Sequence, residues 1–472
     1  MLRFTLCLAV GLFLVAGGDA EVLHVYPDGS GDYPTIQAAI FAASNGDEIE
    51  LADGIYSGHG NSEIYFVGRA ITVRSRSGVP ENCIIDCGGD LSSPSRGFYF
   101  TDNEGPDSIL RGVTVAHGRA QEDPYYYKGG CVMVAFSSPQ FVNCIFRDGY
   151  ALGGGGGVFC RNGSPIFINC RFENNEAGLG AGLDSFFASP AVINCEFTGN
   201  EADLGGGIAL RNNPNALILV ASTLFEGNRA TQRGGGLLCD AGELALSGCR
   251  FDGNFAAGGG AVRIEGTMDV KIQDCWFEDN TSTMGPGGLS YQLAYQGTGI
   301  VSGCTFADNE GGEFGGALLL ASPSIEVPAY VTGCTFYGNS AVEGSSIRLY
   351  GHVAATVENS ILSFGRDGAA ISAGVSSPVS LVCCDIFGNS AGDWTGPVES
   401  QYGIEGNIAE DPLFCDVTGG DFTISIHSPC APGSPPNPEC GLIGAHPPEC
   451  GTTPPASRSE EHTSELQSPS AI

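Results

Sequence analysis

Apolar and polar residues recur along the chain in a repeated phrase, and its asparagine position returns at intervals from 24 residues (365 to 389) to 30 residues (309 to 339). A cysteine often precedes each aromatic residue by two positions, and an asparagine follows it by three. Residues two apart share one face of a β-strand, so cysteine and phenylalanine should point into one interior. The repeated phenylalanines are Phe172, Phe197, Phe225, Phe251, Phe277, Phe306 and Phe336, and the asparagines are Asn175, Asn200, Asn228, Asn254, Asn280, Asn309 and Asn339.

Each repeat contains two further strand patterns. An apolar ladder from Phe141 to Leu381 lies three residues before the cysteine position, and a third apolar strand follows a pair of glycines, as in Gly206-Gly207-Ile208. The residue just before the cysteine is mostly Asn, Gly or Asp, which tolerate the left-handed backbone of a one-residue bend. Three short strands per repeat, without room for a covering helix, predict an all-β, right-handed, single-stranded parallel β-helix of about 12 coils spaced about 4.8 Å apart.

The first part of the chain departs from the repeat and predicts a cap. Between Asp32 and Leu51, the residues Ile36, Ala39, Ile40 and Ala43 follow helical periodicity, and Thr35 precedes them as an N-cap. A short helix here would cover the open end of the first coil, which would otherwise expose strand edges. We place this N-terminal cap at about residues 21–54.

The two ends of the chain are interpreted separately. Residues 1–20 combine Arg3, an apolar run and Gly18-Asp19-Ala20, which is typical of a signal peptide. The β-helix should then cover residues 21–446, with its last coil at about 405–446, and residues 447–457 should form a Pro/Thr linker. Residues 458–472 begin RSEEHTSELQS, which matches an in-frame translation of a common sequencing adapter, so we exclude them from the fold and expect them to be disordered.

The charge and hydropathy of the chain limit its partners. The formal net charge is -33, which disfavours nucleic acid and anionic membranes. No apolar run after residue 20 approaches the roughly 20 residues that span a bilayer, so no transmembrane helix is expected. The sequence therefore predicts a secreted or cell-surface protein, expected to be a monomer, whose partner could be a polysaccharide or another cell-surface component.

The chain resembles the pectin-lyase-like superfamily of right-handed parallel β-helix proteins. The resemblance rests on YPDGSGDYPTIQAAI and GDEIELADGIY near the start, on the FxxN and GG[AIL] phrases, and on NIAEDPLF, SPCAPG and GLIGA near the end. The FxxN and GG[AIL] phrases are similar to the repeats of polymorphic outer-membrane proteins. The ending resembles the last coil of bacterial surface β-helix proteins that often precede a sorting domain. The resemblance covers residues 22–446 and implies the fold, but this fold carries lyases, hydrolases, esterases and non-catalytic adhesins.

The catalytic patterns of those enzymes are incomplete here. The outward positions of the strand that follows the glycines hold one acidic residue, Asp184. The basic Arg348 on the same face lies six coils away, roughly 29 Å along the axis, so the two do not form an acid–base pair. Gly58-His59-Gly60 and Arg263-Ile264-Glu265 partly match polygalacturonase phrases but lie about eight coils apart, and we expect Arg263 and Glu265 outside the helix. We therefore predict no catalytic residue and no metal site, although the acidic turns leave room for loosely bound calcium.

Two aromatic features are candidates for ligand binding. Tyr125, Tyr126 and Tyr127 lie in the unusual loop EDPYYYKGG, and Trp276 occupies an outward strand position. Aromatic faces suit stacking on sugar rings, whereas the alternative is that these rings pack on the solenoid wall.

The 19 cysteines separate into two groups. The ladder cysteines should remain thiols, because parallel side chains on adjacent coils stay farther apart than a disulfide allows. These are Cys170, Cys195, Cys249, Cys275, Cys304 and Cys334. In the Pro-rich tail we predict disulfides between Cys430 and Cys440 and between Cys415 and Cys450.

Two functions follow from the sequence. The first is an exported bacterial β-helix that binds or displays without catalysis, adhesin-like or glycan-binding. The alternative is a polysaccharide lyase or glycoside hydrolase of the same fold with a site built from loops. Whether the protein is an enzyme stays open at this point, with the balance toward the first hypothesis.

Overall fold

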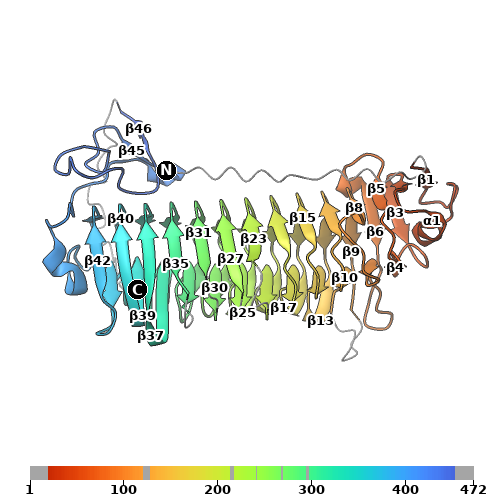
Figure 1. The fold of residues 1–472 in the computed structure, drawn as a ribbon, viewed down its shortest axis with the longest axis horizontal. Helices are drawn as coiled ribbons and strands as arrows, with labels where there is room; N and C mark the ends of the chain where they lie inside the picture. Colours follow the sequence, from red (N-terminus) through yellow and green to blue (C-terminus); the bar gives the residue numbers. More distant parts are fainter. Residues whose placement is uncertain are drawn as a thin grey trace, which may run out of the picture.

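A computed structural model describes residues 20–451 except 121–127, 213–216, 241, 267–268 and 294–296. The chain forms an elongated solenoid in which each coil stacks on the coil before it through parallel pairing (Figure 1). Strands from successive coils align in three long columns, which we name A, B and C, and in a shorter column D. The protein is a right-handed parallel β-helix, as the sequence predicts.

In a typical coil, one strand belongs to column A and the next strand along the chain belongs to column B. Two long strands, β37 (Leu318–Thr332) and β39 (Ile347–Glu358), extend through both columns. The other strands of column A are β4 (Ile64–Tyr65), β7 (Phe98–Phe100), β10 (Val132–Ala135), β14 (Val158–Arg161), β18 (Leu183–Phe186), β22 (Ile208–Arg211), β26 (Leu237–Asp240), β30 (Val262–Glu265), β34 (Leu289–Gln292) and β41 (Ile371–Ala373). The other strands of column B are β1 (Val22–Val25), β2 (Glu48–Leu51), β5 (Thr72–Ser75), β8 (Ile109–Arg111), β11 (Gln140–Val142), β15 (Ile166–Ile168), β19 (Ala191–Ile193), β23 (Leu217–Ala221), β27 (Glu243–Ser247), β31 (Val270–Gln273), β35 (Gly299–Ser302) and β42 (Val379–Val382).

Column C carries the cysteine and phenylalanine ladders in a 13-stranded sheet, so the described chain has slightly more coils than the expected 12 or so. Its strands are β3 (Gly54–Ser57), β6 (Cys83–Asp86), β9 (Thr114–Ala116), β12 (Ile145–Arg147), β16 (Arg171–Glu173), β20 (Glu196–Thr198), β24 (Leu224–Glu226), β28 (Arg250–Asp252), β32 (Trp276–Glu278), β36 (Thr305–Ala307), β38 (Thr335–Tyr337), β40 (Ile361–Ser363) and β43 (Asp385–Phe387). Column D, which the sequence did not predict, adds a fourth strand to six coils: β13 (Tyr150–Gly154), β17 (Glu176–Leu179), β21 (Glu201–Leu204), β25 (Arg229–Arg233), β29 (Phe255–Ala256) and β33 (Thr281–Ser282).

The bend between columns B and C has the predicted backbone. All ten residues at this position have positive φ, between 49° for Ser222 and 63° for Gly303. Asn, Asp and Gly are the residues that adopt this conformation at low cost, which explains why the repeat selects them.

The interior is a set of stacked columns of identical residues. Every repeated phenylalanine from Phe172 to Phe336 is fully buried, and consecutive rings lie parallel with centroids 4.3–5.1 Å apart. The asparagines are buried beside them, and each side chain bonds to a neighbouring coil. Asn200 Nδ2, for example, donates to Asn228 Oδ1 at 2.9 Å and to the carbonyl of Phe172 at 2.8 Å. The register is the expected one, since a one-residue shift would turn these residues outward.

The N-terminal end is closed by α1 (Ile36–Ala42) as predicted. Thr35 caps it, since its Oγ1 accepts a hydrogen bond from the Ala38 amide at 3.2 Å, and Ile36, Ala39 and Ile40 are buried against the first coil. Within the described residues no helix has the length and apolarity needed to cross a membrane. The remaining helices of the described chain are short 3-10 helices, η1 (Pro80–Asn82), η2 (Gly396–Gln401) and η3 (Val417–Gly419).

The C-terminal part differs from the prediction of a last coil at 405–446 followed by a linker. Column C ends at β43, and the chain then folds back to form a small sheet of β44 (Phe414–Asp416), β45 (Asp421–Ser425) and β46 (Pro448–Cys450), drawn in dark blue above the solenoid in Figure 1. The first residues of the predicted linker 447–457 therefore belong to a strand. The sheet packs on column C, where Phe422 and Ile443 are buried.

Two disulfides hold this segment, which we call the C-terminal segment (residues 412–450). Cys415 is bonded to Cys450, the expected pair. The predicted Cys430–Cys440 bond is wrong, because the folded-back segment brings Cys440 against the last coil, where it is bonded to Cys383 with a Cα–Cα distance of 5.8 Å. Cys430 is instead a buried thiol whose Sγ donates to Asp385 Oδ2 at 3.2 Å.

Thiol counting tests this cysteine arrangement. Fourteen cysteines of the described chain, all buried, are free thiols, including the six predicted in the ladder. The ladder thiols donate to backbone carbonyls, as Cys170 Sγ does to Phe141 O at 3.4 Å. We expect 14 thiols to react in denaturant without reductant and 18 with it, in protein that begins after residue 20. A count near zero without reductant would show that the ladder is cross-linked.

Candidate functional site

The surface of column A gathers cationic and aromatic side chains over four neighbouring coils. They lie on β14, β18 and β22, in the turns after β10 and β18 and, for Lys128, in the segment before β10. We call this surface the basic aromatic patch and define it as Lys128, Phe136, Phe159, Arg161, Phe186, Phe187 and Arg211. Because the whole chain has 20 basic and 53 acidic residues, three cations on one surface stand out against their surroundings.

The register of column A builds the patch. Arg161 pairs with Phe186 on the next coil, and Phe186 pairs with Arg211 on the coil after that, so the three side chains follow one another along the helix axis. Parallel strands lie about 4.8 Å apart, which places neighbouring side chains in contact. The Arg211 guanidinium lies 5.2 Å from the Phe186 ring centroid, and the Lys128 ammonium lies 5.2 Å from the same centroid and 4.8 Å from that of Phe159.

Two exposed phenylalanines extend the patch from strained backbone. Phe136 and Phe187 are 58% and 49% exposed, and both have a left-handed backbone, with φ of 56° and 52°. At the same turn of neighbouring coils stand Asn162 and Asn212, which adopt this conformation more easily. A bulky residue with this left-handed backbone destabilises the fold by on the order of 1 kcal/mol. These two turns are therefore less stable than turns with asparagine, and they expose two aromatic rings.

Asp184 lies beneath the patch. Its carboxylate is completely buried and accepts both ends of the Arg211 fork, with Nη2 at 2.7 Å from each oxygen. Burial outweighs the attraction of Arg211 and Lys128 and raises the pKa of Asp184 to about 6. Burial also lowers the pKa of Lys128. Asp184 therefore pairs with one of the three cations of the patch, and Asp240 follows Arg211 in the same register on the next coil.

Arg96 fixes the position of Lys128 on this surface. The Arg96 side chain is buried and donates to the carbonyl of Gly129 at 2.7 Å and to that of Lys128 at 3.0 Å. Tyr99 accepts another Arg96 hydrogen bond at 2.8 Å and donates its own to Glu63 at 2.7 Å. The backbone of Lys128 is therefore anchored by a network that belongs to the coil before it.

A pH titration tests the state of Asp184. An unfolded aspartate has a pKa of about 3.9, so a folded value near 6 means that the folded protein binds the proton more tightly. The stability of the native protein relative to Asp184→Asn should therefore fall as the pH rises from about 4 to about 6, by at most roughly 3 kcal/mol, and then stay constant. Urea denaturation at several pH values measures this difference, and a difference independent of pH would contradict the assignment.

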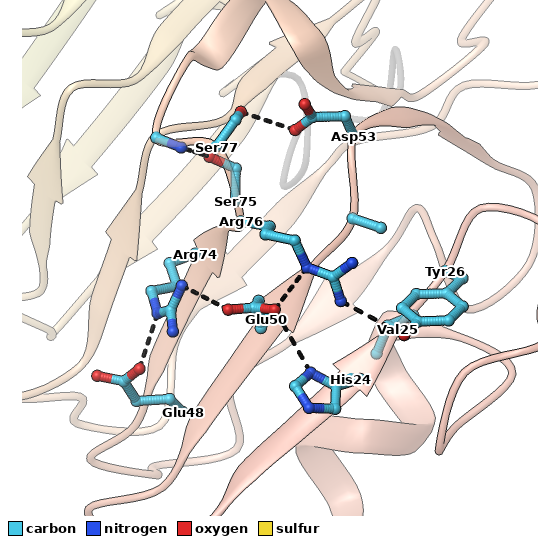
Figure 2. A network of polar contacts seen from close by, with 12 residues as sticks. His24, Val25, Tyr26, Glu48, Glu50, Asp53, Arg74, Ser75, Arg76 and Ser77 are labelled. Carbon is cyan, nitrogen blue, oxygen red and sulfur yellow. Dashed lines mark hydrogen bonds and ion pairs between the residues drawn. The ribbon is translucent and has the colours of Figure 1, made fainter.

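A second polar cluster lies on column B at the N-terminal end (Figure 2). Glu50 accepts from Arg74 at 2.8 Å and from Arg76 at 2.7 Å, and His24 Nδ1 lies 3.5 Å from it. Burial favours a higher pKa for Glu50, but the hydrogen bonds and charges of Arg76 and Arg74 outweigh it and lower that pKa. Arg74 also bonds Glu48 at 2.7 Å, so the carboxylates satisfy both guanidinium groups and the cluster ties the first three coils together.

The aromatic candidates from the sequence have different outcomes. Tyr125, Tyr126 and Tyr127 lie outside the described residues. Trp276 faces outward from β32, but the C-terminal segment covers it, and its ring centroid lies 5.6 Å from that of Phe422 and 5.4 Å from that of His446. This ring is half-buried beneath the chain's own tail, as in the alternative in which it packs against the protein, and a role of Trp276 in ligand binding stays a prediction.

The remaining sequence candidates lie apart from the patch. Arg263 and Glu265 face outward as expected and bond to each other at 2.8 Å, while Val262 and Ile264 are buried. Gly58-His59-Gly60 belongs to the first coils, so the two polygalacturonase-like phrases do not meet. In the part of the chain that the structure describes, no three His, Cys, Asp or Glu side chains are arranged to hold a metal ion.

A family model matches part of this chain, and several solved structures are similar to it. Residues 189–327 match the family model described as a right handed beta helix region. The pectate lyase Pel9A structure is 17% identical, with 91% of this chain and 96% of that chain covered and a TM-score of 0.36. The PL6 family alginate lyase AlyGC is 13% identical, with 84% and 54% covered and a TM-score of 0.40, and the pectin methylesterase from carrot is 13% identical, with 61% and 84% covered and a TM-score of 0.30. No curated protein matches the sequence.

Proposed function

We propose that this protein is an exported, surface-displayed β-helix that binds an acidic polysaccharide on the basic aromatic patch and does not cleave it. The observation that carries the proposal is the concentration of three cations and exposed phenylalanine rings on one surface of a chain with a net charge of -33. Guanidinium groups pair with carboxylates in fork geometry, and ring faces stack on the apolar faces of sugars. The predicted signal peptide at residues 1–20 supports the exported location.

The left-handed phenylalanines permit a sharp test. Replacing Phe187 with asparagine, the residue that neighbouring coils use at this turn, should leave the fold intact or slightly stabilise it. The same replacement removes an exposed ring from the patch. We therefore expect Phe187→Asn to weaken binding of sodium polygalacturonate and alginate at least about tenfold, measured by affinity electrophoresis, while the denaturation midpoint stays equal or rises.

A matched control lies outside the patch on the same solenoid. Leu152 on β13 is 57% exposed, so Leu152→Ala removes a comparable exposed apolar side chain and should leave binding unchanged. Raising the salt concentration should weaken the native protein's binding, because the cations contribute through charge. Equal binding by the native protein and Phe187→Asn, or no binding of acidic glycans at all, would refute the proposal.

A lyase remains the competing function, and Lys128 gives it a specific form. A lysine with a lowered pKa between two phenylalanine rings could accept a proton from a bound uronide. Assays for new unsaturated chain ends on the same polymers separate the two functions. Cleavage that disappears in Lys128→Met would replace the binding proposal with this one.

A further inference from the structure

The outward side of column B is apolar over five coils, from β11 to β27, a stretch marked by β15, β23 and β27 in Figure 1. The inward residues of these strands, from Phe141 to Leu246, are buried in the core. The residues between them point outward and stack in register as two rows. We call these nine partly exposed residues the column B strip: Gln140, Ile166, Ala191, Leu219 and Ala245 in the first row, and Val142, Ile168, Ile193 and Ala221 in the second.

No charged side chain interrupts the strip. Its first three coils contain no Asp, Glu, Lys or Arg between the turn before column B and the bend after it (137–143, 163–169 and 188–194). The rows end at Arg111 on β8 and at Lys271 on β31. Monomeric proteins rarely expose contiguous apolar patches of more than a few hundred Å², and larger patches mark interaction surfaces. The strip is therefore expected to be covered by a partner.

The regular spacing of the strip indicates which partner covers it. Successive coils lie about 4.8 Å apart, so the outward side chains form parallel ridges at that interval. A partner matches these ridges over five coils only if its own surface repeats at the same interval. A second copy of this chain has that spacing. A two-fold axis perpendicular to the face sets strip against strip, with the two sheets about 10 Å apart.

Charge and area agree with a second copy. Two chains with a net charge of -33 each repel one another, and the strip is where they can approach without bringing like charges into contact. The face from turn to bend measures about 23 Å along the strands and about 24 Å across five coils, on the order of 500 Å² per copy. A pair buries roughly 1,000 Å², the lower limit of a specific interface, which corresponds to a weak and reversible dimer.

We infer that the column B strip is the interface of a reversible homodimer in which two copies pack strip against strip about a two-fold axis. This state differs from the monomer that the sequence predicts. The inference does not rest on the proposed function, but it has a consequence for it. Phe136 and Phe187 lie in the turns that lead into β11 and β19, so the basic aromatic patch of each copy lies beside the interface. The dimer would therefore offer two patches to one polymer.

Sedimentation velocity of the full chain, without any glycan, tests the dimer. We expect a monomer–dimer equilibrium at protein concentrations up to about 100 µM. Ile193→Glu places a charge on the middle strand of the strip in both copies and should weaken the dimer at least about tenfold. The fold should tolerate this change, because the same row carries Glu358 on β39. Ser302→Glu is the matched control: it adds the same charge in the same row four coils away and should dimerise like the native protein.

The response to salt separates this contact from glycan binding. Raising NaCl from about 20 mM to about 500 mM should tighten the dimer, because screening reduces the repulsion between the two chains, whereas it should weaken the binding of acidic glycans. Circular dichroism checks the fold of each variant. If Ile193→Glu does not fold, Ile193→Gln, which copies Gln273 in the same row, should still weaken the dimer at least about threefold.

Three results would overturn the inference: a native protein that stays monomeric at every concentration and salt level, a folded strip variant that dimerises like the native protein, or an equal loss in Ser302→Glu. Because the dimer is measured without glycan, its failure and the failure of acidic glycan binding are separate outcomes.

Discussion

Replacing Phe251 with alanine should lower the free energy of unfolding by about 3–5 kcal/mol. The Phe251 ring is fully buried, and it is stacked between Phe225 and Phe277 with centroid distances of 4.6 and 5.0 Å. Alanine removes both stacking contacts and leaves a cavity that the neighbouring coils cannot close, because their hydrogen-bonded register holds them apart. Chemical denaturation followed by circular dichroism measures the loss.

The control for this prediction is the exposed Leu152→Ala, which should change the same free energy by less than about 0.5 kcal/mol. Since each coil contacts mainly its neighbours, Phe251→Ala should destabilise the middle coils most. An additional unfolding transition at lower denaturant concentration would therefore also agree with the prediction. A loss no larger than that of Leu152→Ala would show that the phenylalanine column contributes little to stability.

The repeat could be predicted from the sequence because the residues that stabilise each coil recur at the same positions. Phenylalanine, asparagine and the bend residue recur at fixed positions, and each has one environment that suits it: a stacked interior, a ladder of side-chain amides and a left-handed turn. Column D was missed because its outward residues, such as Glu176, Glu201 and Arg229, vary in charge while its inward residues are small alanines. Such a strand has no strong apolar alternation.

The tail was mispredicted because its docking depends on contacts far apart in the sequence. One signal was present in the outward positions of column C. They change from the charged Arg171, Glu196 and Arg250 to Trp276, Thr305, Thr335 and Ile361, and the last three are buried under the C-terminal segment. When the outward side chains on one face of a solenoid change from charged to uncharged, that face is expected to be covered by another segment of the chain.

The basic aromatic patch was also missed, since its members are separated in sequence and no motif joins them. The sequence predicts Asp184 as a lone acid on this face, with no base near it. The partner is Arg211, which lies on the next coil two residues farther along its strand, and Asp184 accepts its guanidinium fork. Phe136 and Phe187 gave a second signal, because bulky residues occupy a turn where Asn162 and Asn212 are preferred.

Replacing Asn228 with aspartate should destabilise the protein by more than about 3 kcal/mol at neutral pH, and less at acid pH. Asn228 Nδ2 donates to Phe197 O at 2.7 Å and to Asn254 Oδ1 at 3.0 Å. Aspartate replaces this donor with a charged oxygen that faces two acceptors in a fully buried site. The other oxygen can still accept from the Asn200 amide and side chain, at 3.1 and 2.9 Å in the native protein.

The sign of the pH dependence follows from the buried charge. Burial and the two facing acceptors should raise the folded pKa of the introduced carboxyl above its unfolded value of about 3.9. The folded state then binds the proton more tightly, so the destabilisation should be complete above the folded pKa and should shrink as the pH falls through it. A protonated carboxyl also regains one donor for Phe197 O or Asn254 Oδ1. Asn228→Ala, which lacks a titrating group, should lose stability equally at pH 4 and pH 7, so parallel urea titrations of the two variants decide whether the asparagine ladder works through its donors. If Asn228→Asp shows no more pH dependence than Asn228→Ala, the donor role assigned to Asn228 Nδ2 is wrong.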